Sequence, residues 1–177
     1  MDYKAMFHQF HPRFFEEKSI RSMPKEEVFE EQILDLRGFD PTSVKLTCPE
    51  NITFGMYAGD MEALRRAVAL VDDDWVQYFS DGDDIYCAFD GGKVVSFCLL
   101  DEFGVHEGIR VSGPGCVGTV PAYRGKGIGL KLVQNATAIL KERGYDLSYI
   151  HYTHVGPWYA KLGYETVLRW CADGFAE

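Results

Sequence analysis

Paired cysteines are missing from this sequence, and their absence excludes two common ways of stabilising a small protein. The five cysteines are scattered and include no C-x-x-C pair. An odd number of isolated thiols indicates neither a disulfide framework nor a structural zinc site. Their positions are Cys48, Cys87, Cys98, Cys116 and Cys171. This cysteine usage fits the reducing cytoplasm, and we expect the protein to hold no metal.

Long apolar runs are missing as well. The longest run, Val94–Leu100, is far shorter than the roughly 20 apolar residues that a membrane-spanning helix needs. Residues 1–4 lack the basic-then-apolar order of a secretion signal. We therefore expect a cytoplasmic protein with no membrane partner.

Basic residues are scarce relative to acidic ones. Lys and Arg together number 18 against 27 Asp and Glu, which gives a net charge of −9. Nucleic acids are bound through an excess of positive charge, so no nucleic-acid partner is expected. Most of the carboxylates are explained by solubility, although an acidic face would also attract a cationic substrate. The length of 177 residues fits a single domain.

The first 41 residues combine aromatic and charged side chains. Phe29, Ile33 and Leu36 recur at helical spacing, which predicts a helix over Lys25–Arg37 that ends at Gly38. Residues 1–41 are thus predicted to form an N-terminal helical extension, either part of the same domain or an arm, before a domain over residues 42–177. The pair His8-x-x-His11 lacks a further ligand at metal spacing, so packing explains it better.

The next segment predicts strands and helices in alternation. Period-two patterns, caps and an Asp-Gly-Gly turn define these elements. A strand is expected to end at Val120, and the polar residues 101–108 are expected to form the loop that leads to it. The expected elements are strands at Val44–Cys48 and Ile52–Tyr57, a helix from Asp60 to Val71, a short helix at Trp75–Phe79 capped by Asp72–Asp74, and a hairpin of Ile85–Phe89 with Lys93–Leu100.

A glycine-rich loop then separates a strand from a helix. Cys116–Val120 favours a strand, Leu130–Arg143 carries a helical apolar stripe, and glycines alternate through Arg124–Gly129 between them. Glycine backbone and a helix N-terminus together favour binding of phosphate, and Arg124 and Lys126 add positive charge. The following strand, Leu147–His151, should run parallel to the first after a right-handed crossover. Ligands of open α/β sheets bind beyond the carboxyl ends of such strands.

Two motifs in this region resemble a known family. Val120-Pro-x-Tyr followed by Arg124-x-x-Gly127-x-Gly129 is similar to the pyrophosphate-binding signature of the GNAT superfamily of acyl-CoA-dependent N-acetyltransferases. Tyr159-x-x-x-Gly163-Tyr164 resembles a second segment of that superfamily, in the expected order and at the expected distance. The resemblance is firm over residues 115–170. It implies a mixed α/β fold, in which helices flank a central sheet and two parallel strands splay at an acetyl-CoA cleft.

The resemblance also implies roles for individual residues. The co-substrate acetyl-CoA would be bound by Gly118, Thr119, Val120, Arg124, Gly125, Lys126, Gly127, Ile128 and Gly129. The glycines at 113, 115 and 118 favour a bulge or a close backbone approach. Unpaired N–H groups of this strand would stabilise an oxyanion. Tyr159 would be the general acid, because a phenol with a pKa of about 10 keeps its proton at neutral pH. Tyr152 stands where many members of the superfamily have an asparagine.

The general base and the acceptor stay open at this point. His151 and His154 are candidates because imidazole titrates near pH 6.5, and Asp101, Glu102 and Glu107 are rivals. We expect transfer of an acetyl group to a primary amine of a small cationic molecule, such as an amino sugar, polyamine or aminoglycoside. Residues 72–74 would supply an acidic wall. A homodimer is possible, and the alternatives are a catalytically silent acyl-CoA sensor or a peptide or protein N-acetyltransferase.

Overall fold

The computed structural model describes residues 1–176, so the last residue of the expected domain over 42–177 lies outside the described residues. The helices are α1 (Tyr3–Phe10), α2 (Lys18–Arg21), α3 (Met61–Ala69), α4 (Ile128–Glu142) and α5 (Gly156–Ala160), with 3₁₀ turns η1 (Phe14–Glu16), η2 (Asp73–Tyr78) and η3 (Pro121–Tyr123). The strands are β1 (Phe29–Asp35), β2 (Ile52–Met56), β3 (Ile85–Asp90), β4 (Lys93–His106), β5 (Ile109–Thr119), β6 (Leu147–Thr153), β7 (Glu165–Cys171) and β8 (Gly174–Ala176).

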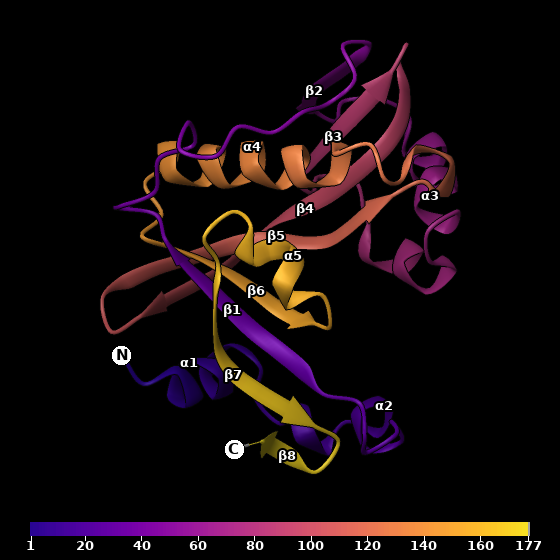
Figure 1. Cartoon of the computed structure of the whole chain (residues 1–177). Coiled ribbons are helices and arrows are strands. Elements are labelled where there is room, and N and C mark those ends of the chain that lie inside the picture. The colour runs from indigo at the N-terminus through magenta and orange to yellow at the C-terminus, as the bar shows by residue number, and fades with distance from the viewer. Residues whose placement is uncertain (177) are drawn as a thin grey trace.

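All eight strands belong to one mixed sheet in the order β2-β3-β4-β5-β6-β1-β7-β8. β5 and β6 run parallel, and the other neighbours run antiparallel. Helices cover both faces of this sheet, which confirms the expected mixed α/β architecture (Figure 1). The strand β1 comes early in the chain, yet it lies between the late strands β6 and β7.

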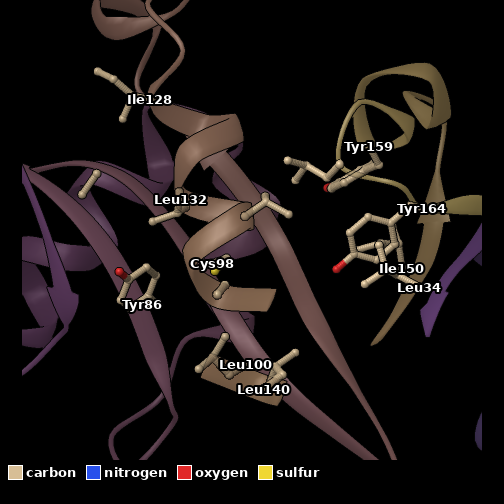
Figure 2. Packing of buried hydrophobic residues seen from close by; sticks show 14 of the residues in the cluster. Leu34, Tyr86, Cys98, Leu100, Ile128, Leu132, Leu140, Ile150, Tyr159 and Tyr164 are labelled. Atoms are coloured by element: carbon tan, nitrogen blue, oxygen red, sulfur yellow. The ribbon is translucent and has the colours of Figure 1, made fainter. Parts of the chain in front are cut away.

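The two faces of the sheet have separate cores. On one face, α4 buries Leu132, Ala136 and Leu140 against strand residues such as Cys98 and Ile150 (Figure 2). On the opposite face, α3 and η2 pack on the part of the sheet formed by β3 and β4. That face also holds α1 and η1, which cover β6, β1 and β7. The separation follows from the alternation of strand side chains, since Cys98 belongs to the α4 core and its neighbour Phe97 to the α3 core.

Several local predictions are confirmed. The Asp60 carboxylate caps α3 by accepting hydrogen bonds from the backbone N–H groups of Glu62 and Ala63. Asp72 caps the next short element, which is the 3₁₀ turn η2. The Asp90-Gly-Gly92 turn joins β3 to β4, and the crossover through α4 leads to the parallel strand β6. Each of these features depends on residues close together in the sequence.

The helix predicted over Lys25–Arg37 is wrong, because residues 29–35 form the strand β1. The spacing of Phe29, Ile33 and Leu36 fits one face of a helix, but Glu31, Gln32 and Leu34 are buried too. An inner strand that is covered on both faces loses its period-two pattern, so the helical spacing misled the prediction.

Two further predictions are corrected. Val44–Cys48 is not a strand: this segment crosses over α4, where the side-chain amide of Gln134 donates a hydrogen bond of 2.8 Å to the Val44 carbonyl (Figure 1). Residues 101–106 are not a loop but the continuation of β4, which turns into β5 at Glu107 and Gly108, both with positive φ. The short edge strand β8 was not predicted.

Candidate active site

The strands β5 and β6 separate soon after they begin, which leaves an opening between their backbones. They pair only at Val111 with Leu147 and at Ser112 with Ser148, although both strands continue further. At Gly113, where they start to diverge, an added Cβ would overlap the carbonyl oxygen of Tyr149. The splayed parallel pair that the sequence predicted is therefore present, and it begins at the closest approach of the two backbones.

A bulge lies in β5 at this opening. Gly115 pairs with Leu99 and Gly118 with Phe97, so that Cys116 and Val117 together face a single residue of β4. Cys116 has a φ of 47°, which is unusual for a residue with a side chain. Bulges leave backbone groups without ladder partners. The expected bulge is thus confirmed, and it lies at the opening between β5 and β6. Burial raises the pKa of the Cys116 thiol to about 12, so this side chain is a poor nucleophile.

The glycine loop closes the end of β5 and starts α4. Gly125 and Gly127 have φ values of 74° and 80°, a region that favours glycine. The first hydrogen bond of the helix runs from the Lys131 N–H to the Gly127 carbonyl, so the N–H groups of Ile128–Leu130 precede it and need other partners. No side chain caps this helix start within the described residues. These amides form a ready site for an anion.

The surroundings of the loop fit a bound pyrophosphate. A Cβ at Gly125 would enter open space, whereas a Cβ at Gly127 would overlap the carbonyl of Thr47 in the segment that crosses α4. The Arg124 Nε donates to the Thr119 carbonyl at 3.0 Å, which ties the loop to the strand end. The other residues expected to bind the co-substrate lie in and around this loop. Lys126 lies over the Tyr123 ring, and Gly129 lies against the Thr119 hydroxyl and Trp158. Val120 and Ile128 are buried, and Gly118 lies against Phe97.

Tyr159 lies on α5, on the α4 face of the sheet. Its side chain is 6% exposed and packs edge-on against Trp158 and Tyr164. Burial raises the pKa of its phenol, so the hydroxyl stays protonated at neutral pH. Figure 2 shows this hydroxyl directed toward α4, whereas the hydroxyl of Tyr164 bonds Thr137 on α4 and Ser148 on β6. The two tyrosines therefore differ: Tyr164 holds elements together, and Tyr159 presents an O–H group without a partner among residues 1–176.

His151 lies on the opposite face of the opening. Its Nδ1 is 2.9 Å from the Glu31 carboxylate, and its ring stacks on His11 with centroids 3.6 Å apart. His154 is exposed beyond the end of β6, and its ring meets the edge of Phe29 at 6.2 Å. Of the candidate histidines, the structure thus places His151 beside the opening and His154 in solvent.

Asp101 on β4 shares this side of the opening with His151. Its carboxylate lies where a Cβ on Gly115 would be, which places it over the bulged part of β5. Burial and the charge of Asp83 raise the pKa of Asp101 to about 6, and the charge of His151 partly offsets this rise. Glu102 is exposed, and Glu107 lies in the turn after β4, so these two rivals are outside the group.

The acidic segment and Tyr152 border the same region. Asp72 accepts a hydrogen bond from the Asp74 N–H, and its charge contributes to the raised pKa of the Cys116 thiol. Asp73 and Asp74 are exposed. The Tyr152 ring stacks on Trp170 at 4.9 Å, so this residue serves aromatic packing. Glu31 was missed by sequence reasoning because its strand was predicted to be a helix.

Within residues 1–176, no group of three or more His, Cys, Asp and Glu side chains is arranged to hold a metal ion. Within the same residues, every helix is too short or too polar to span a bilayer.

Known structures share this fold at low sequence identity. A glucosamine N-acetyltransferase region of a fungal multi-domain β-N-acetylglucosaminidase aligns with a TM-score of 0.68 and 22% identity, over 81% of this chain and 20% of that one. A GCN5-related N-acetyltransferase from Sphaerobacter thermophilus aligns with a TM-score of 0.60 and 21% identity, over 80% of this chain and 49% of that one. One from Kribbella flavida aligns with a TM-score of 0.55 and 18% identity, over 80% of this chain and 55% of that one. The chain thus spans between a fifth and about half of these proteins.

The sequence itself carries the signature of one family. The profile of the acetyltransferase (GNAT) domain matches residues 81–166, which hold the splayed strands, the bulge, the glycine loop and most of the segment around Tyr159. No curated protein matches the sequence. Residues 81–166 thus carry an acetyltransferase (GNAT) domain, and the domain match together with the shared fold supports a member of the GNAT superfamily.

Proposed function

We propose that this protein is an N-acetyltransferase that moves an acetyl group from acetyl-CoA to a primary amine. The observation that carries the proposal is the continuity of three features along one strand end. The opening between β5 and β6 lies next to the bulge at Cys116, and β5 leads through η3 and the glycine loop to the uncapped N-terminus of α4. The opening would take the thioester arm, the bulge would bind the oxyanion, and the helix N-terminus would bind the pyrophosphate.

The residues of the glycine loop would hold the pyrophosphate of acetyl-CoA. The N–H groups that precede the first helical hydrogen bond supply donors, and Arg124 and Lys126 supply positive charge. The backbone of β5 beyond the bulge would pair with the extended part of the co-substrate. Acetyl-CoA supplies the activated acyl group, and N–H groups at the bulge would stabilise the negative charge that develops on its carbonyl oxygen.

Protons would move on both faces of the sheet. Tyr159 reaches the opening from the α4 face and keeps its proton, so it suits the role of donor to the departing thiolate. His151 and Asp101 reach the opening from the other face, where an amine would enter and must lose a proton. Acid and base would then act from opposite sides and would not neutralise each other.

A small cationic amine suits the acceptor side. Asp101 and Asp72 both act on the Cys116 thiol through their charges, which places two carboxylates near the bulge. With a pKa of about 6, Asp101 is ionised at neutral pH and would attract an ammonium group. The fungal relative is described as a glucosamine N-acetyltransferase region, which supports amino sugars as the first class to examine. Polyamines and aminoglycosides follow, and the five free thiols fit a reducing cytoplasm as the location.

Calorimetry with acetyl-CoA tests the first half of this proposal. Arg124→Ala removes a charge and Gly127→Val places a side chain in a backbone that favours glycine, so each should weaken binding while circular dichroism keeps its helix and sheet signal. If the double variant bound acetyl-CoA like the wild type, the pyrophosphate site would be assigned wrongly.

A screen of amines with detection of released CoA thiol tests the second half. Amino sugars, polyamines, aminoglycosides and peptides with free N-termini or lysines would be compared at equal concentration. Turnover confined to the peptides would overturn the small-molecule acceptor. Binding of acetyl-CoA without thiol release for any amine would identify the protein as a silent acyl-CoA sensor instead.

A further inference from the structure

Glu31 is a carboxylate in the interior of the sheet, with 0% of its surface exposed. It lies on β1 between β6 and β7 and accepts four hydrogen bonds. The donors are the Tyr149 hydroxyl, the His151 ring Nδ1 at 2.9 Å, the Tyr152 backbone N–H at 3.1 Å and the Trp170 indole N–H at 2.6 Å. Buried charges are tolerated when hydrogen bonds replace their lost water, and here both oxygens are satisfied.

The backbone of β6 departs from regular pairing directly opposite Glu31. Glu30 pairs with Thr153 and Gln32 with Ile150, so His151 and Tyr152 together face one residue. Tyr152 has a φ of 59°, and its N–H is one of the groups that Glu31 binds. Bulges re-aim side chains, and strained residues persist only where their surroundings hold them. Glu31 therefore stabilises the local backbone that sets the direction of His151.

The His151 ring has one engaged nitrogen and one open nitrogen. Its Nδ1 faces Glu31, while its Nε2 makes no hydrogen bond within residues 1–176. The buried polar atoms without partners in those residues are His11 Nε2, Gln32 Oε1 and His106 Nε2, so the Nε2 of His151 is not sealed from solvent. The side chain as a whole keeps 22% of its surface exposed. A carboxylate at Nδ1 fixes the proton there and leaves Nε2 free to accept another.

The groups around the His151 ring favour a proton on Nδ1 and a free Nε2. His11 stacks on it at 3.6 Å, and burial together with the charge of His151 lowers the pKa of His11 to about 3, so the stacked ring stays neutral. Phe7 and Phe14 contact the ring at centroid distances of 5.8 and 5.3 Å. From β4, Asp101 faces the same space, and its pKa responds to the charge of His151. The negative groups that bear on His151 are thus Glu31 behind it and Asp101 on the open side.

We propose that Glu31 is the positioning residue of the acetyl transfer, holding His151 with its proton on Nδ1 so that Nε2 takes the proton of the acceptor amine. This inference rests on the proposed function. As the amine nitrogen bonds to the acyl carbon, its proton passes to Nε2 and the imidazolium is stabilised by the Glu31 carboxylate. The carbon–sulfur bond breaks and the thiolate receives a proton from Tyr159. The proton on Nε2 then passes through water to the Tyr159 phenolate, so both residues return to their starting states.

Nitrogen NMR of the histidine rings tests the positioning without any turnover. At a pH where the ring is neutral, wild-type His151 should show the Nδ1-protonated tautomer almost exclusively. Glu31→Gln keeps the shape of the side chain and removes its charge, so the Nε2-protonated tautomer should become readily detectable. Glu30→Gln is the matched control, because Glu30 is the preceding residue and pairs with Arg169 at 3.1 Å. It should leave the His151 signals unchanged.

Kinetics with the best amine of the screen provides the second readout. Glu31→Gln should lower kcat about 100-fold, within the range of lost general base catalysis, and leave the KM for acetyl-CoA within about twofold. Tyr149→Phe removes one donor to Glu31 but leaves the carboxylate and His151, so it should retain most of kcat and the wild-type tautomer. Glu30→Gln should retain both.

The outcomes separate this inference from the proposed function. An Nε2-protonated His151 in the wild type would overturn the inference, whether or not Glu31→Gln folds. Wild-type kcat in folded Glu31→Gln would also overturn it. An Nδ1-protonated His151 in a protein that releases no thiol with any amine would instead refute the acetyl transfer, and with it the catalytic role of Glu31.

Discussion

Replacing Tyr159 by phenylalanine removes one oxygen atom and leaves the ring that packs between Trp158 and Tyr164. The hydroxyl makes no hydrogen bond to another group within residues 1–176, and the residue is 6% exposed. A neutral hydroxyl without a partner adds little to stability, so we expect the free energy of unfolding to change by less than about 1 kcal/mol. As a general acid, the same hydroxyl would contribute roughly 10²- to 10⁴-fold to kcat, or about 3–5 kcal/mol of barrier.

Tyr164→Phe is the matched control for this variant. Its hydroxyl bonds Thr137 at 2.8 Å and Ser148 at 2.7 Å in the same core. Removing it leaves buried polar groups unpaired, so the free energy of unfolding should fall by about 1–3 kcal/mol while kcat stays near the wild-type value. Urea unfolding and thiol release at saturating acetyl-CoA measure the two effects. A Tyr159→Phe protein with wild-type kcat would remove Tyr159 from the mechanism.

Three further substitutions test the glycine loop and the acidic side of the opening. Gly125→Ala places a Cβ in open space and Gly127→Ala places one against the Thr47 carbonyl. Gly125→Ala should lower the free energy of unfolding by only roughly 1–2 kcal/mol, the cost of a left-handed backbone at a residue with a side chain. Gly127→Ala should lower it by more. Urea unfolding measures both values, and equal losses would contradict the contact with Thr47. Asp101 has a pKa raised to about 6, so its contribution to stability is lost as pH rises from about 4 to 6. Asp101→Asn should remove this decrease, which amounts to about 3 kcal/mol, and unfolding curves that keep the wild-type pH dependence would contradict the raised pKa.

The parts of the site that the sequence predicted are coded locally. The glycine loop, the start of α4 and the Tyr159 segment each depend on spacings of a few residues, and the structure places all of them beside one opening. The parallel strand β6 followed from the crossover rule and needed no knowledge of distant contacts. The bulge at Cys116 could be predicted because three glycines interrupt a strand pattern.

The parts that the sequence did not predict depend on distant contacts. Glu31 lies in a run where Phe29, Ile33 and Leu36 imitate a helix, and a glutamate on a helix is normally exposed. Its burial becomes reasonable only with Tyr149 and Trp170, which are 118 and 139 residues further along the chain. Asp101 was weighed as a base but placed in a loop, because residues 101–108 are polar and show no regular pattern. The strand β4 nevertheless continues through them, and it accommodates Gly104 at a positive φ of 124° without ending.

Because β1 lies between β6 and β7, it is synthesised long before the two strands with which it pairs. A ribosome that adds roughly 5–20 residues per second needs about 6–24 s to make the 118 residues from Glu31 to Tyr149. During that time β1 has been made but neither of its neighbours exists, and its apolar side chains have no native surface to cover them. Because β6 and β7 do not pair with each other, the sheet is completed only when the oldest strand inserts between the two youngest. Because α1 and η1 are made before β1 and pack on it in the folded protein, their early docking would keep β1 from pairing elsewhere.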